Sequence, residues 1–278
     1  SHLDHTGQAN DGLAGVAVGI EVIKRIRQEF AHPEYNYELF VMPETIGSAV
    51  FLASHEHLIN SYLGSIFVEM AGIRSPIDFS HTRRGNTYLD RVLIDVLKTK
   101  GTEFTEWSFG RPWGNDEKIF DSAGVGIPSA SIGRHPFNFY HTSGDNLEAT
   151  DASSLEEIVE VLMDAVRLIE SDFVPRPVQK VPVYLTRFNL YADAVRERTQ
   201  HFSNSAIIEL LWSGMSVFDI SRTIDVEYKQ VLQYVEGFVS NGLVERVALD
   251  PLYFKRSLDS FGVDRDTLGS RDASKPMQ

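Results

Sequence analysis

Histidines and carboxylates that could bind a metal ion gather in a few short segments of the chain. These segments read SHLDHTGQANDG at residues 1–12, PETIGS at 43–48, FVEMAG at 67–72 and YHTSGDNLE at 140–148. The candidate side chains are His2, Asp4, His5, Asp11, Glu44, Glu69 and His141. Because the chain has no cysteine, disulfides and zinc–thiolate sites are excluded. The remaining ligand types favour a hydrolase-like metal site.

The triplet His2-Leu3-Asp4 is the first candidate pair. In an extended segment, residues two apart point to the same face. A metal-bound histidine usually donates its second ring N–H to a carboxylate, so the spacing suits His2 as a ligand with Asp4 beside it. His5 competes for the same role. The alternative interpretation of the triplet is an ordinary surface loop.

Asp11 precedes a run of apolar residues at helical spacing, from Leu13 to Ile26. A carboxylate at this position is a natural N-cap of the helix. It could instead turn away from the helix and bridge two metal ions. The glycines that flank it, Gly7, Gly12 and Gly15, would allow the backbone to approach such a site closely.

Glu44 and Glu69 each come at the end of an apolar run. Residues 37–42 predict a buried strand that ends before Glu44, for which a solvated loop carboxylate is the alternative. Residues 62–70 predict a second strand, in which Glu69 is the one acid. A carboxylate there must be paired, protonated or metal-bound if it is buried. Sheet enzymes place catalytic groups at such strand ends.

His141 follows a strand that we expect to end at Arg134. Asp145 is close enough in sequence to orient the imidazole of His141, and Tyr140 is a candidate substrate contact. Arg134 could bind a carboxylate or phosphate of a substrate, because guanidinium groups pair well with such anions. A simple salt bridge is its alternative role.

The elements that must position these side chains indicate an α/β protein. We expect a three-layer α/β/α domain with a mixed sheet at residues 1–174, in which residues 75–86 form a polar excursion or short hairpin. The predicted helices cover residues 13–26, 49–58, 87–98 and 155–170. The predicted strands cover residues 37–42, 62–70 and 103–109 and the run that ends at Arg134.

A proline-rich linker at residues 175–186 leads to a second domain at 187–256, and a polar tail covers 257–278. Three short helices and a strand predict a winged helix. Its presumed recognition helix carries Glu227, Lys229 and Glu236 but no basic cluster, so protein contact or dimerisation is favoured over DNA binding. A net charge of -13 also disfavours nucleic acid and anionic membranes as partners.

The chain shows neither a membrane-spanning apolar run nor a signal peptide, so we expect a cytoplasmic location. It begins at Ser1, and its first residues already resemble the end of a strand. We therefore expect the N-terminal strands of the sheet to be absent from this sequence. We expect the natural protein to have upstream sequence, or another chain to complete the sheet.

In their order along the chain, these motifs resemble the zinc aminopeptidase family, which also contains the glutaminyl cyclases. The H-x-x-H, A-N-D and E-T-I-G-S forms and the winged helix more narrowly resemble aminopeptidase-like proteins of polysaccharide and natural-product biosynthesis clusters. The resemblance implies one or two zinc ions, with His2 and Glu69 on one, His141 on the other and Asp11 bridging. Asp4 would orient His2 or tune the metal.

The resemblance implies hydrolysis of an amide bond in a small peptide or amide. The metal would activate water and polarise the carbonyl while a glutamate moves the proton. Family members typically have two adjacent glutamates, one as base and one as ligand, where this chain has Pro43-Glu44-Thr45. The resemblance implies a catalytic role for Glu44, either as the base, with one metal poorly bound, or as a ligand, with the base missing or supplied from elsewhere. Glu69 stands where an aspartate is usual. A deacylase or acyl-transfer enzyme, a degenerate binding module and a DNA-binding factor are the alternatives.

Overall fold

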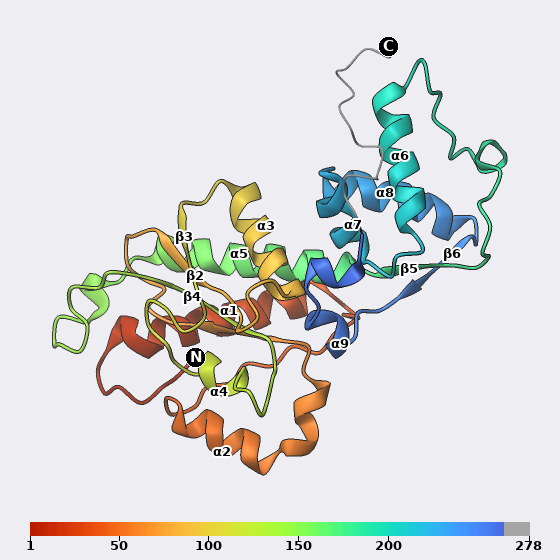
Figure 1. The fold of residues 1–278 in the computed structure, drawn as a ribbon. Coiled ribbons are helices and arrows are strands. Elements are labelled where there is room, and N and C mark those ends of the chain that lie inside the picture. Colours follow the sequence, from red (N-terminus) through yellow and green to blue (C-terminus); the bar gives the residue numbers. More distant parts are fainter. Residues whose placement is uncertain (264–278) are drawn as a thin grey trace. The chain divides into compact units, whose positions relative to one another are not determined.

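The computed structural model describes residues 1–263, which form two compact units (Figure 1). The first unit comprises residues 1–171 and 250–257, and the second comprises residues 172–249 and the described part of 258–278. Most of the predicted polar tail therefore lies outside the described residues. None of the helices within residues 1–263 is long and apolar enough to cross a membrane.

A four-stranded mixed sheet with the order β1-β4-β2-β3 forms the centre of the first unit. Strand β1 (Ser65–Val68) runs parallel to β4 (Ser129–Arg134), and β4 runs antiparallel to β2 (Ile77–Ser80). Strand β3 (Phe104–Trp107) lies parallel to β2 at the edge of the sheet. The expected mixed α/β fold is confirmed.

Strand β2 corrects the prediction of a polar excursion or hairpin at residues 75–86. It lies between two other strands, and all four of its residues are buried. The sequence pattern concealed this strand because it contains Asp78. The Asp78 carboxylate is tolerated in the interior because it accepts a hydrogen bond from Trp107 Nε1 at 2.6 Å and lies 3.1 Å from His135 Nδ1.

The segment at residues 37–42, expected to be a buried strand, is extended but lies outside the sheet. Its one ladder contact is an isolated parallel bridge between Met42 and His2. The backbone N–H of Leu3 donates to the carbonyl of Met42 at 3.0 Å, and the N-terminal amine of Ser1 donates to the carbonyl of Phe40 at 3.2 Å. This pairing fixes the first three residues of the chain beside the turn that carries Glu44.

Helices α1 (Ala14–Glu29), α3 (Tyr88–Lys100) and α5 (Ala152–Ser171) confirm the three long helices expected in this unit. Helix α5 packs against both α1 and α3. Helix α3 begins with a capping box, in which Thr87 and Asp90 exchange side-chain and backbone hydrogen bonds. The shorter helices of the unit are α2 (Ile46–Ser54), α4 (Glu117–Phe120) and α9 (Pro251–Phe254).

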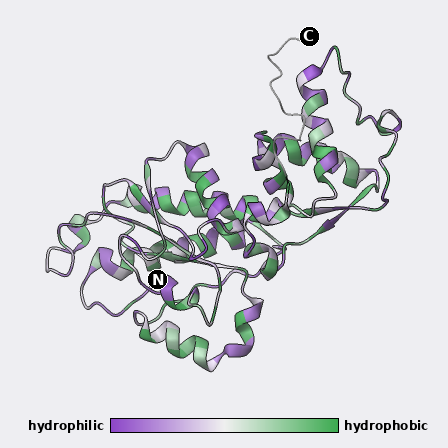
Figure 2. Ribbon diagram, viewed as in Figure 1, coloured by the Kyte–Doolittle hydropathy of each residue, from purple (hydrophilic) through white to green (hydrophobic). Residues whose placement is uncertain are grey.

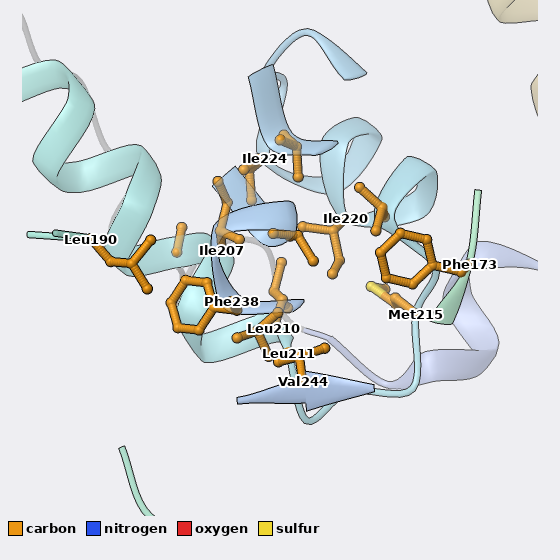
Figure 3. Packing of buried hydrophobic residues seen from close by; sticks show 14 residues of the cluster. Phe173, Leu190, Ile207, Leu210, Leu211, Met215, Ile220, Ile224, Phe238 and Val244 are labelled. Carbon is orange, nitrogen blue, oxygen red and sulfur yellow. The ribbon is translucent and has the colours of Figure 1, made fainter. Parts of the chain in front are cut away.

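The second unit is a small helical bundle with a two-stranded antiparallel sheet. Its helices α6 (Arg198–Leu210), α7 (Val217–Ile224) and α8 (Tyr228–Ser240) and strand β6 (Val244–Val247) lie where the sequence predicted three helices and a strand. The helices carry hydrophilic and hydrophobic residues (Figure 2), and hydrophobic side chains from them meet in one core (Figure 3).

Strand β5 (Val174–Pro177) pairs with β6, so the range predicted as a linker, 175–186, begins inside a strand. Proline is accepted there because a two-stranded sheet has only edge strands, which leave one side of the backbone unpaired. The domain boundaries and the winged-helix assignment stay predictions.

Candidate metal centre

Two backbone features bring His2 to the interior of the first unit. The pairing of residues 1–3 with residues 40–42 directs the imidazole inward, where His2 has no exposed surface. Gly12 lies directly against it with a φ of +98°, and a Cβ atom at Gly12 would be 3.0 Å from the His2 carbonyl oxygen and 3.1 Å from Nδ1. Glycine is therefore required at residue 12 for both its conformation and its size.

Asp11 lies in an irregular turn rather than at a helix cap. Residues Ala9–Leu13 form a π-helical turn in which the backbone of Asp11 departs from helical geometry, and the N-cap of α1 is Leu13. Asp145 holds this turn by accepting the backbone N–H groups of Asn10 at 2.7 Å and Asp11 at 2.9 Å. The N-cap interpretation of Asp11 is thus wrong, and Asp145 positions Asp11 instead of orienting His141.

A first set of ligand atoms surrounds the Nε2 atom of His2. It lies 3.0 Å from Glu69 Oε1 and 3.4 Å from Asp11 Oδ1. The other ring nitrogen, Nδ1, lies 3.1 Å from Asp4 Oδ1. A carboxylate can only accept, so Asp4 favours the tautomer with the proton on Nδ1 and leaves the Nε2 lone pair for a metal.

A second set of ligand atoms shares Asp11 with the first. His141 Nε2 is 3.1 Å from Asp11 Oδ2, and His5 Nε2 is 3.9 Å from Asp11 Oδ1. Ligand atoms of His5, Asp11 and His141 lie within 4.8 Å of one another, as do those of His2, Asp11 and Glu69. The sequence left His5 as a competitor of His2, whereas the structure brings both histidines to the centre. A third grouping joins His2, His5 and Glu44.

The electrostatics of the centre call for a cation. Burial lowers the pKa of His2, but the carboxylates of Asp11 and Glu69 outweigh this effect and raise the pKa to about 10. Both side-chain oxygens of Asp11 are buried and make no hydrogen bond of good geometry, and each faces an imidazole nitrogen, His2 Nε2 at 3.4 Å from Oδ1 and His141 Nε2 at 3.1 Å from Oδ2. A divalent metal ion would satisfy these oxygens, and a donor set of imidazole nitrogens and carboxylate oxygens suits Zn²⁺. The residues present therefore fit the metal.

Residues 1–172 match the family described as a domain of unknown function, DUF4910. The chain belongs to the DUF4910 family. A Clostridium acetobutylicum protein named for polysaccharide biosynthesis and an aminopeptidase-like domain is 29% identical over 170 residues, which are 60% of this chain and 38% of that protein.

A crystal structure from Clostridium acetobutylicum, named as that of a peptidase, has a TM-score of 0.71 and 23% identity, covering 88% of this chain and 56% of that one. BSAP, a zinc aminopeptidase from Bacillus subtilis, has a TM-score of 0.50 and 18% identity, covering 59% of this chain and 43% of BSAP. The recognised resemblance is confirmed. The DUF4910 chain spans about two fifths to about half of the length of these relatives.

Glu44 lies at the mouth of the DUF4910 centre, with Oε2 3.4 Å from His5 Nε2 and its side chain 35% exposed. Its backbone N–H donates to Asp4 Oδ2 at 3.0 Å, so Asp4 joins the Glu44 turn to His2. The next residue, Thr45, donates its N–H to Asp116 Oδ1 at 2.9 Å, and the Ser48 hydroxyl donates to the same oxygen. Asp116 therefore holds the turn that presents Glu44.

Backbone strain accumulates at this centre. Within residues 1–263, five non-glycine residues have a positive φ, and three of them are Thr45, Met70 and His141. The first two directly follow Glu44 and Glu69, and the third is itself a candidate ligand. A left-handed conformation is costly for a threonine, so the surrounding structure must enforce it, and such strain is common at functional sites.

Two predicted substrate contacts differ in their outcome. Tyr140 stacks on His141 with ring centroids 3.8 Å apart, so it lies at the centre. Arg134 is not among the residues brought together. It is buried, its guanidinium donates to Glu157 and to the carbonyl groups of Ser75 and Ser154, and the structure gives it the salt-bridge role instead.

The structure also adds residues that the sequence analysis did not assign to the centre. Asn115 Nδ2 lies 3.3 Å from both carboxylate oxygens of Glu69, and Asp116 holds the Glu44 turn as described above. Both residues precede α4 in a pair, Asn115-Asp116, that was visible in the sequence as a helix start. The sequence did not indicate that Asn115 contacts Glu69 or that Asp116 contacts Thr45, because these residues lie 46 and 71 positions apart and meet only in the folded chain.

Proposed function

We propose that this chain is a zinc-dependent hydrolase that cleaves the amide bond of small peptides or aminoacyl amides, in the manner of an aminopeptidase. The observation that carries the proposal is the position of Asp11. Its carboxylate is buried between two sets of imidazole and carboxylate ligand atoms, and its oxygens face the Nε2 atoms of His2 and His141. A shared carboxylate with ligands on both sides is the arrangement that a pair of metal ions requires.

Under this proposal, His2, Asp11 and Glu69 hold one zinc ion, and His5, Asp11 and His141 hold the other. His5 then supplies the ligand atom that is missing at Thr45, so Glu44 is free to act as the general base. Bound zinc would lower the pKa of a water molecule and polarise the scissile carbonyl. Glu44 would accept the proton of the attacking water and pass it to the leaving amine.

Asp4 contacts both a proposed metal ligand, His2, and the backbone of the proposed base, Glu44. Through Oδ1 it fixes the tautomer of His2, and through Oδ2 it accepts the backbone N–H of Glu44. We therefore assign Asp4 a positioning role. Removing it would disturb a metal ligand and the base together, because one carboxylate contacts both.

The second candidate is a deacylase or acyl-transfer enzyme that acts on a biosynthetic intermediate. It uses the same metal and base, and it is favoured by the polysaccharide-biosynthesis name of the Clostridium acetobutylicum relative. Chromatography and mass spectrometry of the products formed from candidate amides and N-acylated sugars separate the two candidates. Cleavage of aminoacyl amides alone would support the peptidase.

For the second unit we propose a winged-helix role in protein contact or dimerisation. The order of α6, α7, α8 and β6 supports it, and the acidic residues Glu227 and Glu236 speak against a DNA-binding surface on α8. Light scattering after size-exclusion chromatography tests dimerisation, and salt-sensitive DNA binding would contradict the proposal. A cytoplasmic location also stays a proposal.

The enzyme proposal is tested by zinc content and amide hydrolysis measured on the same preparations. We expect about two zinc ions per chain by mass spectrometry, one for each ligand set, and fewer in His5→Ala. Glu44→Gln should keep its zinc and lose roughly 10²- to 10⁴-fold in kcat on aminoacyl 4-nitroanilides, the usual contribution of a general base.

His57→Ala is the matched control, because His57 is an exposed histidine that belongs to none of the candidate ligand groups within residues 1–263. It should retain both zinc and activity. A protein that binds no zinc, or that binds zinc and cleaves no amide, would contradict the proposal and leave a binding module. Loss of zinc in Glu44→Gln would make Glu44 a ligand instead of the base.

A further inference from the structure

A pocket lies over strands β1, β4 and β2 beside the metal centre, with an empty volume of about 320 Å³ that includes open solvent. The side chains that decide its chemistry are Glu69, Asp78, Trp113, Asn115, Glu117 and His135. Glu69 belongs to both places, because it lines the pocket while its Oε1 atom lies 3.0 Å from His2 Nε2. The pocket therefore adjoins the first ligand set.

A run of aromatic rings connects the pocket to the second ligand set. The ring of Trp113 lies 5.5 Å from His135 on one side and 5.7 Å from Tyr140 on the other. Tyr140 in turn stacks on His141 at 3.8 Å. A substrate with its scissile bond at the centre could thus extend a side chain along this wall into the pocket.

His135 presents an unused hydrogen-bonding atom. Its Nδ1 atom lies 3.1 Å from Asp78 Oδ2, and Asp78 Oδ1 already accepts from Trp107 Nε1 at 2.6 Å. Because a carboxylate only accepts, Nδ1 carries the proton and the Nε2 atom of the neutral ring is an acceptor. That Nε2 atom is buried and has no hydrogen-bond partner. It calls for a donor from a ligand.

The charge of the pocket points the same way. Besides the proposed zinc ligand Glu69, its lining includes the acidic residues Asp78 and Glu117 and no lysine or arginine. Glu117 is 1% exposed and accepts the backbone N–H of Asn115 through both oxygens at 3.0 Å. Burial raises the pKa of Glu117 to about 7, and a cation beside it would favour its charged form. An anionic side chain would meet like charge here, whereas a cation would be stabilised.

We propose that this pocket is the subsite for the side chain of the cleaved residue and that it selects a basic side chain. The inference rests on the proposed function. His135 Nε2 accepts a hydrogen bond from the ammonium or guanidinium group, Glu117 provides opposite charge, and Trp113 packs against the aliphatic stem and the cation. His135 and Trp113 are then substrate-binding residues that determine specificity.

The test compares two amino acids that differ only in the terminal ammonium, L-lysine and L-norleucine, by calorimetric titration of the zinc-loaded protein. We expect lysine to bind about ten- to a hundredfold more tightly, the usual effect of one hydrogen bond to a charged group. His135→Phe keeps an aromatic ring and removes Nε2, and Trp113→Ala changes a side chain that is 52% exposed, so its removal should cost little stability. Both should remove most of the preference, and His57→Ala should retain it.

The matching kinetic comparison uses lysyl and norleucyl 4-nitroanilides, for which we expect the same ratio in kcat/KM. Equal binding of the two amino acids, no binding of lysine, preference for L-glutamate, or a lysine preference that survives in both His135→Phe and Trp113→Ala would overturn the subsite. If aminoacyl amides are still cleaved, the proposed function stands. A lysine preference in a protein that cleaves no amide would instead retain the subsite and reject the hydrolase.

Discussion

Asp145 provides the sharpest test of how the fold positions the bridging carboxylate. It is 1% exposed, and its oxygens accept the backbone N–H groups of Asn10 at 2.7 Å and Asp11 at 2.9 Å. It is absent from the candidate ligand groups found within residues 1–263. Asp145→Asn should therefore weaken zinc binding only by releasing the turn that carries Asp11.

The size of the effect follows from these two hydrogen bonds. The asparagine keeps one acceptor oxygen, so one bond to a charged acceptor, worth about 1.5–3 kcal/mol, is lost. The second bond becomes a neutral one, and the new NH₂ group opposes a buried N–H donor. We expect the free energy of unfolding to fall by about 3 kcal/mol. Misplacement of Asp11 should raise the Kd for zinc roughly 10- to 100-fold.

Urea denaturation in the presence of a chelator measures the stability, and competition with a fluorescent chelator measures the zinc Kd. Asp90→Asn is the matched control, because Asp90 is also 1% exposed and accepts two backbone N–H groups, those of Thr82 at 2.7 Å and Thr87 at 2.8 Å, at helix α3. It should lose similar stability and keep its zinc affinity. Wild-type zinc affinity in Asp145→Asn, or equal loss in both variants, would refute the reasoning.

Two further predictions concern residues away from the metal. Arg134→Ala should lower the free energy of unfolding by about 2–3 kcal/mol with KM unchanged, because the carbonyl groups of Ser75 and Ser154 lose the hydrogen bonds of the buried guanidinium. The lost pair with Glu157 adds little, because the Glu157 side chain is 39% exposed. Arg74→Ala, whose side chain is 82% exposed, should cost less than about 1 kcal/mol. A raised KM for anionic substrates would restore the substrate-binding role of Arg134. Burial raises the pKa of Asp90, but hydrogen bonds from His81, Thr82 and Thr87 outweigh this and lower it below 3.8. The contribution of Asp90 to stability is therefore present above about pH 4 and is lost as the pH falls through its pKa in the folded protein. Asp90→Asn should therefore make the free energy of unfolding less sensitive to acid below about pH 4. Parallel pH profiles of the free energy of unfolding for the wild type and Asp90→Asn would contradict this.

The candidate ligands that the structure brings together could be named from the sequence because each stands out by its residue type and its local pattern. His2 and Asp4 share a face of an extended segment, and Glu69 is the one acid in an apolar run. These are local patterns, so no knowledge of the tertiary fold was needed. The long helices followed from periodicity in the same way, as helix α3 shows with its capping box.

What the sequence concealed depends on partners far along the chain. Strand β2 looked polar because it contains Asp78. Asp78 can be buried because it contacts Trp107 and His135, which lie 29 and 57 residues away in the sequence. Asp145 looked like a partner of His141 because the two are close in sequence. Its true partners, Asn10 and Asp11, lie 135 and 134 residues away. The local sequence cannot show which partner Asp145 has, because His141 and the backbone N–H groups of Asn10 and Asp11 could each donate to its carboxylate.

The presence of a single glutamate, Glu44, in the Pro43-Glu44-Thr45 turn is best understood together with His5. The turn at Thr45 is held by Asp116 in a left-handed conformation, so this residue supplies geometry for Glu44 and not a ligand. His5, by contrast, has its Nε2 atom 3.4 Å from Glu44 and 3.9 Å from Asp11. An imidazole in place of a carboxylate leaves the ligand sets with one negative charge fewer. Under the proposed function, the centre is therefore more electron-poor than one built on paired glutamates, which favours activation of water at lower pH.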